Sequence, residues 1–161
     1  MPNWCKTKYV ITGSKEDVSN LNSIFQKVLS MKDNKSGDFN NNWLGFVVSE
    51  LNGDNKEIAC RGWFKDYKLK NRTTLRLTTY SAWCPCFELF EFIVQKYPSL
   101  QYYFIAEEPA MDVYITNDAE KRYFRFGKKY DVYNKDAIKD NIKILKSFTG
   151  MANNQVYVHV S

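Results

Sequence analysis

The sequence predicts a single α+β domain over residues 1–161. Segments rich in β-branched and aromatic residues alternate with segments in which apolar residues recur at helical spacing. The chain of 161 residues is 44% hydrophobic, which is enough to bury one core. No segment approaches the roughly 18 apolar residues that a membrane-spanning helix needs. We therefore expect a cytoplasmic protein with no membrane contact.

The first third of the chain predicts one strand and one helix. Residues 4–12 read as a strand because β-branched and aromatic residues concentrate there. A helix from Ser14 to Met31 follows, since its first residues have the spacing of a capping box and its apolar residues share one face. The polar segment 32–42 predicts an exposed loop, and the apolar segment 43–48 a short buried element.

The middle of the chain predicts two strands, a helix and a further strand. Residues 58–67 and 72–80 resemble strands, and the residues between them, 68–71, predict a hairpin turn. Residues 86–97 have the clearest helical pattern, starting after a proline that a first helical turn tolerates. Residues 101–107 predict the next strand.

The predicted order of strand, helix, strand, strand, helix and strand is that of a ferredoxin-like βαββαβ fold. In that fold two helices cover one face of an antiparallel sheet. We place this core at about residues 3–108 and a C-terminal extension at about 109–161. The extension is predicted to contain a hairpin of 113–116 with 122–126, a helix from Asp136, and a strand at 155–160. The alternating pattern of that last strand makes it a candidate for pairing in a homodimer.

Several short motifs also occur in a characteristic order. They are Asn3-Trp4-Cys5, Val10-Ile11-Thr12-Gly13, Trp43-Leu44-Gly45, Ala82-Trp83 before Pro85, Tyr97-Pro98, and the run from Glu107 to Asp112. Over residues 3–116 the chain thereby resembles the YubB-type ferredoxin-like family of phage, plasmid and bacterial proteins. The resemblance implies the fold and an origin on a mobile element, so that a phage-encoded copy would act in the host cytosol. It carries no catalytic residues over to this chain.

The four cysteines are weak candidates for a metal site. Antiparallel pairing of the first and third strands would bring Cys5 near Cys84 and Cys86, and Cys60 tends toward the same end of the sheet. Four thiols can bind zinc. The Cys-x-Cys spacing is unusual for zinc, however, and the predicted hairpin places Cys60 opposite Thr79, several residues short. We expect buried free thiols and no metal.

Few residues favour catalysis, and we assign neither a catalytic residue nor a cofactor. The single histidine, His159, has no evident partner, and no glycine-rich phosphate-binding motif is present. The acidic run 107–112 brings three carboxylates to a strand end, where they could act in acid–base chemistry. Glu107 and Glu108 are adjacent on a strand, so their side chains should point to opposite faces.

Basic and aromatic residues alternate in the run 121–130, which indicates a surface for an anionic partner such as a nucleotide or nucleic acid. A net charge of +5 agrees with such a partner. The alternative is an ordinary amphipathic strand. An RNA-recognition mode is disfavoured, because residues 73–79 of the third predicted strand include no aromatic ring. The predicted ligand-binding residues are Arg61, Lys65, Trp83, Glu107, Arg122, Tyr123, Arg125 and Lys128.

Three functions remain open. The first is a non-enzymatic protein that binds or sequesters an anionic ligand, a nucleotide signal or a nucleic acid, with a role in counter-defence. The second is an inhibitor that contacts a host protein through exposed rings such as Trp43, Trp63 or Trp83. The third is a small enzyme that uses the acidic run 107–112. The sequence favours them in that order.

Overall fold

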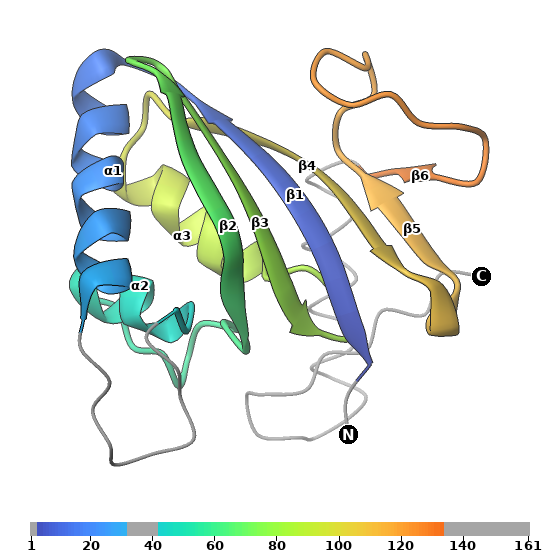
Figure 1. The fold of residues 1–161 in the computed structure, drawn as a ribbon, viewed down its shortest axis with the longest axis horizontal. Coiled ribbons are helices and arrows are strands. Elements are labelled where there is room, and N and C mark those ends of the chain that lie inside the picture. Colours follow the sequence, from blue (N-terminus) through green and yellow to red (C-terminus); the bar gives the residue numbers. More distant parts are fainter. Residues whose placement is uncertain (1–2, 32–41, 134–161) are drawn as a thin grey trace.

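The computed structural model describes residues 3–31 and 42–133 of the chain. These residues form one sheet with helices beside it (Figure 1). The elements in chain order are β1 (Trp4–Thr12), α1 (Lys15–Ser30), α2 (Gly45–Glu50), β2 (Gly62–Asn71), β3 (Thr74–Ala82), α3 (Phe87–Lys96), β4 (Gln101–Glu108), the 3-10 turn η1 (Pro109–Met111), β5 (Val113–Thr116) and β6 (Asp131–Val132). The predicted α+β class is confirmed.

The six strands lie in the order β2-β3-β1-β4-β5-β6. Neighbours pair antiparallel from β2 to β5, whereas β5 and β6 are parallel. Two features go beyond the predicted order of elements: helix α2 precedes β2, and β5 and β6 extend the sheet past β4.

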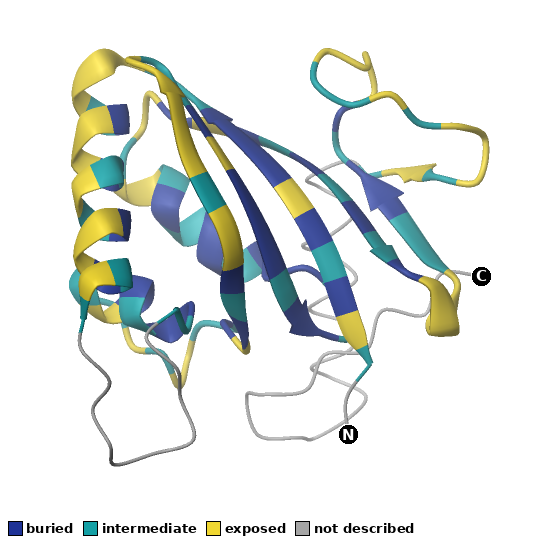
Figure 2. Cartoon of the chain, in the orientation of Figure 1, coloured by how far each residue is buried: buried dark blue, intermediate teal, exposed yellow. Residues whose placement is uncertain are grey.

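Helices α1 and α3 pack on the same face of the sheet. The ring of Phe25 in α1 lies 5.2 Å from that of Phe64 in β2, and Phe90 in α3 stacks on Tyr9 in β1 at 3.7 Å. Residues paired across neighbouring strands point to the same face of a sheet. Phe64 pairs with Thr79, Thr79 pairs with Thr7, and Thr7 is two residues from Tyr9 on β1, so Phe64 and Tyr9 lie on the same face. We call this the helix-covered face and the opposite side the open face. Residues of β1 alternate between more exposed and buried from Trp4 to Tyr9, after which Val10 and Ile11 are both buried (Figure 2).

The start of α1 is fixed by local and long-range hydrogen bonds. The Ser14 hydroxyl accepts from the backbone N–H of Asp17, which confirms the predicted cap. The Ser14 N–H donates to the hydroxyl of Ser99, in the turn between α3 and β4, and that hydroxyl donates to the Asp17 carboxylate. These bonds join the N-terminus of α1 to the start of β4.

The predicted boundaries of the β2–β3 hairpin were wrong. Strand β2 begins at Gly62, because residues 54–58 form a turn in which the Ile58 N–H donates to the carbonyl of Asp54. Residues 68–71 belong to β2, and the chain reverses at residues 72–73. The Asn71 side chain accepts from the backbone N–H of Thr73, which stabilises the turn at this later position.

The second arm of the predicted C-terminal hairpin was also wrong. Residues 122–126 form no strand, and β5 instead pairs with β4 on one side and with β6 on the other. The predicted strands 4–12, 101–107 and 113–116 and both predicted helices up to Tyr97 are confirmed. The loop prediction for 32–41, the helix from Asp136, the strand 155–160 and His159 lie outside the described residues.

No helix among residues 3–31 and 42–133 is long and apolar enough to cross a bilayer.

Candidate ligand-binding site on the open face

The strand register arranges the side chains of the open face in rows across the sheet. The first row, from β2 to β5, is Trp63, Tyr80, Lys6, Glu107 and Tyr114. The second is Asp66, Thr78, Lys8 and Ile105, and the third is Lys68, Arg76, Val10 and Tyr103. Most of these side chains are partly or fully exposed; Thr78 and Val10 are buried. Aromatic and basic residues therefore share one surface.

Three aromatic rings lie together at one end of this face. The ring of Trp4, at the start of β1, lies 4.3 Å from that of Trp63, and Trp63 lies 6.2 Å from Tyr80. The backbone of Trp63 is paired on both sides, because β2 pairs with β3 on one side and Trp63 forms a bridge to Trp43 on the other. We call Trp4, Trp63 and Tyr80 the aromatic cluster.

Four cations, Lys6, Lys8, Lys68 and Arg76, follow the cluster along the open face; we call them the open-face cations. Within the described residues, the ion pairs are Lys27 with Glu50 and Arg122 with Glu120, so no open-face cation has a carboxylate partner within 4 Å. Lys68 and Arg76 lie directly opposite each other on paired strands. Like charges in that position destabilise a sheet. Folding therefore gains nothing from this pair.

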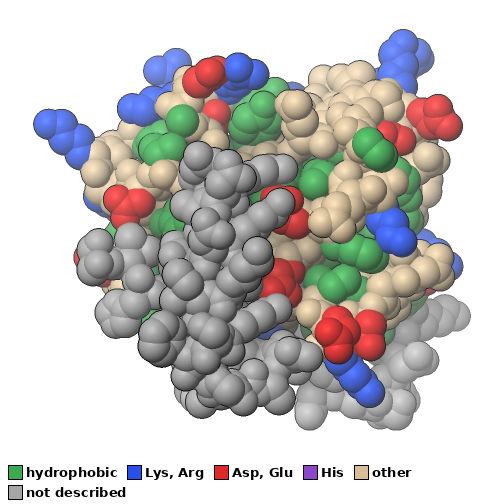
Figure 3. All heavy atoms as spheres, turned by 180° about the vertical axis from the view of Figure 1, so that it is seen from behind, with side chains coloured by type: hydrophobic (Ala, Val, Ile, Leu, Met, Phe, Trp, Pro, Cys, Tyr) green, Lys and Arg blue, Asp and Glu red, His purple; other side chains and the backbone are tan. Residues whose placement is uncertain are grey.

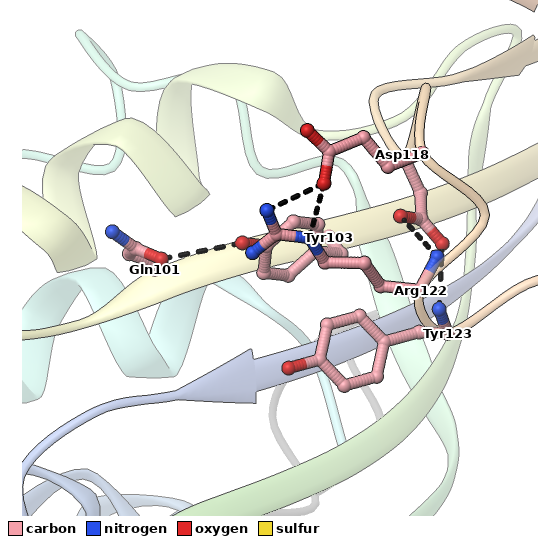
Figure 4. A network of polar contacts seen from close by, with 6 residues as sticks. Gln101, Tyr103, Asp118, Arg122 and Tyr123 are labelled. Carbon is pink, nitrogen blue, oxygen red and sulfur yellow. Dashed lines mark hydrogen bonds and ion pairs between the residues drawn. The ribbon is translucent and has the colours of Figure 1, made fainter.

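The loop after β5 supplies a second group of rings and charge at the far corner of the open face. The buried carboxylate of Asp118 accepts backbone hydrogen bonds from Arg122, Tyr123 and Phe124 at 2.8 to 2.9 Å. This contact turns the loop back over β4, where the ring of Tyr123 lies 4.7 Å from that of Tyr103 (Figure 4). We call Tyr103, Arg122 and Tyr123 the loop site.

Arg122 is fixed by its own neighbours. Its guanidinium donates to the Glu120 carboxylate at 2.6 Å, and the Tyr103 hydroxyl donates to Gln101 (Figure 4). The hydrogen bond that Arg122 donates to Glu120 is the main reason that the pKa of Arg122 is raised, with a smaller contribution from Tyr103. The side chain is therefore charged at neutral pH.

The sequence-predicted residues fall into separate groups. Arg61 lies over the ring of Trp83 at 5.1 Å, at the end of β3 that carries the aromatic cluster. Arg122 and Tyr123 belong to the loop site at the far corner of the open face. Glu107 lies in the first row beside Lys6 and accepts a hydrogen bond from Tyr130. The remaining three are exposed: Lys65 in an irregularity of β2, and Arg125 and Lys128 in the loop.

The acidic run does not converge on one point. Glu107 lies on the open face, whereas Glu108 is buried on the other face and accepts from the N–H groups of Ala110 and Met111. Glu108 therefore caps the 3-10 turn, and Asp112 ends it in a left-handed conformation with a φ of 55°. Glu107 and Glu108 therefore do not form the pair of carboxylates that acid–base chemistry by the run 107–112 would need.

The cysteines lie near one another at one end of the sheet, as predicted, but in a different register. Phe64, not Cys60, lies opposite Thr79, because the hairpin turns later than expected. Burial raises the pKa of Cys5 and Cys84 to about 12 and that of Cys60 to about 11, and it raises that of Cys86 as well. Among the described residues, no three of His, Cys, Asp and Glu are arranged to hold a metal ion. All four are thiols at neutral pH.

Sequence reasoning missed the open-face cations and Tyr80. Tyr80 lies within both the predicted strand 72–80 and the observed β3, so this central strand carries an aromatic ring, which corrects the premise drawn from residues 73–79 against an RNA-recognition mode. The signal was the period of two: Trp4, Lys6 and Lys8 alternate with residues that become buried.

The opposite side of the molecule carries helices α1 and α3 (Figure 1). Seen from behind, Lys and Arg side chains lie mainly around the outline, and acidic side chains are interspersed with hydrophobic ones (Figure 3). No protein-family model, curated protein or solved structure matches the chain.

Proposed function

We propose that this protein binds a nucleotide or nucleic acid on the open face of its sheet and does so without catalysis. The observation that carries the proposal is the aromatic cluster beside four cations that have no ion-pair partner within the described residues. Rings stack on bases, and ammonium and guanidinium groups bind phosphate. The residues of the open face match both halves of such a ligand.

Energetics favour a ligand role for these residues over a structural one. Stacking of one base on an aromatic side chain contributes about 1–3 kcal/mol. A hydrogen bond to a charged group contributes roughly 1.5–3 kcal/mol. In the unbound protein, by contrast, Lys68 and Arg76 repel each other across the β2–β3 pair. An anionic ligand would relieve that repulsion.

The fold supports a related proposal. We infer that β1, α1, β2, β3, α3 and β4 form a ferredoxin-like unit, with α2, β5 and β6 added to it. The neighbours β2-β3-β1-β4 and the packing of both long helices on one face support this inference. A phage or mobile-element origin, and with it a role in counter-defence, rests on the motif resemblance between residues 3 and 116.

A ligand panel tests the proposal. Purified protein would be mixed with mononucleotides, cyclic dinucleotides, short oligonucleotides and, as a control for charge alone, inorganic phosphate. A ligand that binds the native state raises the melting temperature. It should also quench tryptophan fluorescence, because Trp4 and Trp63 lie in the cluster.

Charge-reversal variants locate the site. Lys8→Glu combined with Arg76→Glu should weaken binding at least about tenfold, since each lost charged contact costs roughly 1.5 kcal/mol or more. Lys15→Glu combined with Lys56→Glu, two reversals at exposed positions in α1 and in the turn before β2, is the matched control and should leave binding unchanged. No response to any nucleotide or oligonucleotide would contradict the proposal and favour a protein partner for the aromatic cluster.

A further inference from the structure

We propose that the ligand is a single-stranded nucleic acid that contacts the aromatic cluster and the loop site at once. This inference rests on the proposed function and narrows its ligand from any nucleotide to an extended chain. The observation behind it is that the open face carries two separate groups of rings, with cations between them.

The strand register gives the distance between the two groups. Trp63 and Tyr103 are three strands apart across the sheet and four residues apart along it, as measured from Lys6 to Val10 on β1. With about 4.8 Å between strands and 3.3 Å per residue, the separation is roughly 20 Å. One base cannot stack on both groups, because stacked rings must be in contact.

Positive charge follows the diagonal between the two groups. Lys8 occupies the second row on β1, between the row of Trp63 and the row of Tyr103. Arg76 lies beside this path on β3, and Glu107 lies on its other side, next to Lys6. A phosphate backbone would therefore run over Lys8 and Arg76, between the carboxylates of Glu107 on β4 and Asp66 on β2.

The far end of this path is held in place by hydrogen bonds within the protein. Three backbone N–H bonds to Asp118 hold the loop, and the Tyr123 ring lies against Tyr103. The guanidinium of Arg122, which is paired with the exposed carboxylate of Glu120, lies beside these rings (Figure 4). A chain bound at the aromatic cluster would find the loop site as a second anchor at high effective concentration, with little entropy lost in ordering the protein.

Length dependence tests this inference. Dissociation constants would be measured by fluorescence anisotropy for a series from thymidine monophosphate to labelled thymidylate oligomers of about 2 to 12 nucleotides. Affinity should rise steeply once an oligomer spans both groups. Arg122→Ala with Tyr123→Ala should lower the affinity of the long oligomers about tenfold or more and should abolish the gain with length, because one anchor is lost. Lys56→Ala, a charge removal in the turn before β2, is the matched control.

The outcomes separate this inference from the proposed function. Equal affinity for the mononucleotide and the longest oligomer would overturn the two-anchor inference and leave the proposed function standing. A gain with length that survives in the Arg122→Ala, Tyr123→Ala variant would overturn it as well. Absence of binding by every member of the series, together with no response to cyclic dinucleotides, would overturn the proposed function itself.

Discussion

The two faces of the sheet are built from the same strands and differ in what their residues contribute. On the helix-covered face, Tyr9, Leu77 and Phe104 are almost completely buried and pack with the helices. On the open face, their strand neighbours Lys8 and Arg76 are exposed and have no ion-pair partner within the described residues. Burial of apolar area accounts for the first set. Stability offers no comparable reason for the second.

This difference indicates where function can be sought in a chain with few motifs. Residues that contribute little to the stability of the fold can be selected for binding a partner. Their side-chain chemistry then matches the chemistry of that partner. On this sheet the open-face positions carry the rings of Trp4, Trp63, Tyr80 and Tyr103 and four cations together with the carboxylates of Asp66 and Glu107. Variants on the two faces should therefore separate stability from binding.

The largest effect on stability is expected from Phe90→Ala in α3. Phe90 is fully buried and stacks on Tyr9 at 3.7 Å, so its removal leaves a cavity in the centre of the core. We expect a loss of about 3–5 kcal/mol in the free energy of unfolding, measured by urea denaturation. Tyr80→Ala on the open face is the comparison and should cost about 1 kcal/mol or less. Equal losses at the two positions would contradict the division between the faces.

The next largest effect is expected from Asp118→Ala. This change removes an acceptor from three backbone N–H groups, and the loop that carries Tyr123 loses its attachment. The free energy of unfolding should fall by about 2–3 kcal/mol. Trypsin should then cleave more readily at Lys121, Arg122 and Arg125. Glu120→Ala, which removes only an exposed ion pair, serves as the control and should change neither measurement appreciably.

A smaller effect is expected from alkaline pH through the buried thiols. Cys5 ionises near its ordinary value of 9.0 in the unfolded chain but near 12 in the folded protein, because burial disfavours the thiolate. Its contribution to stability is thus complete below about pH 9 and is lost as the pH rises from 9 toward 12. The loss should reach about 1 kcal/mol at one pH unit above the unfolded pKa.

Cys5→Ser isolates this contribution, since a serine hydroxyl does not titrate in that range. Because the Cys5 thiol is fully buried, the melting temperature should decline less steeply between about pH 7 and 10.5 for the variant than for the native chain. Parallel declines would place the alkaline sensitivity in other groups, such as the tyrosines.

The elements with a strong period were predictable from the sequence, and those determined by distant contacts were not. The repeat along residues 18–29 sufficed for α1, and the concentration of β-branched and aromatic residues in 4–12 sufficed for β1. The hairpin turn was misplaced because three of the four residues 68–71, namely Lys68, Lys70 and Asn71, are of types that are common in turns. Polar residues occur here because β2 is an edge strand, where lysines discourage pairing with other chains.

The loop after β5 shows why the candidate site was only partly predictable. The Asn117 side chain accepts from the Phe104 N–H and donates to the Tyr102 carbonyl, so that a side chain replaces strand pairing at this point. Asp118 then bonds to the backbone of residues ahead of it in the sequence. In the sequence, Asn117 and Asp118 are typical of a turn that joins two hairpin strands. The basic run that follows was therefore predicted to be the second strand of that hairpin.

The smallest effect on stability, and the one that separates the faces most sharply, is expected from Lys68→Glu. The change replaces repulsion across the β2–β3 pair with attraction to Arg76, so the free energy of unfolding should rise by about 0.2–1 kcal/mol. The same change places a negative charge beside the proposed path of the phosphates, so oligonucleotide affinity should fall. Lys70→Glu on the same exposed strand is the control for added charge. A variant that gains stability while losing affinity would show that the native lysine is retained for a partner, whereas gain of both would argue that no anion binds there.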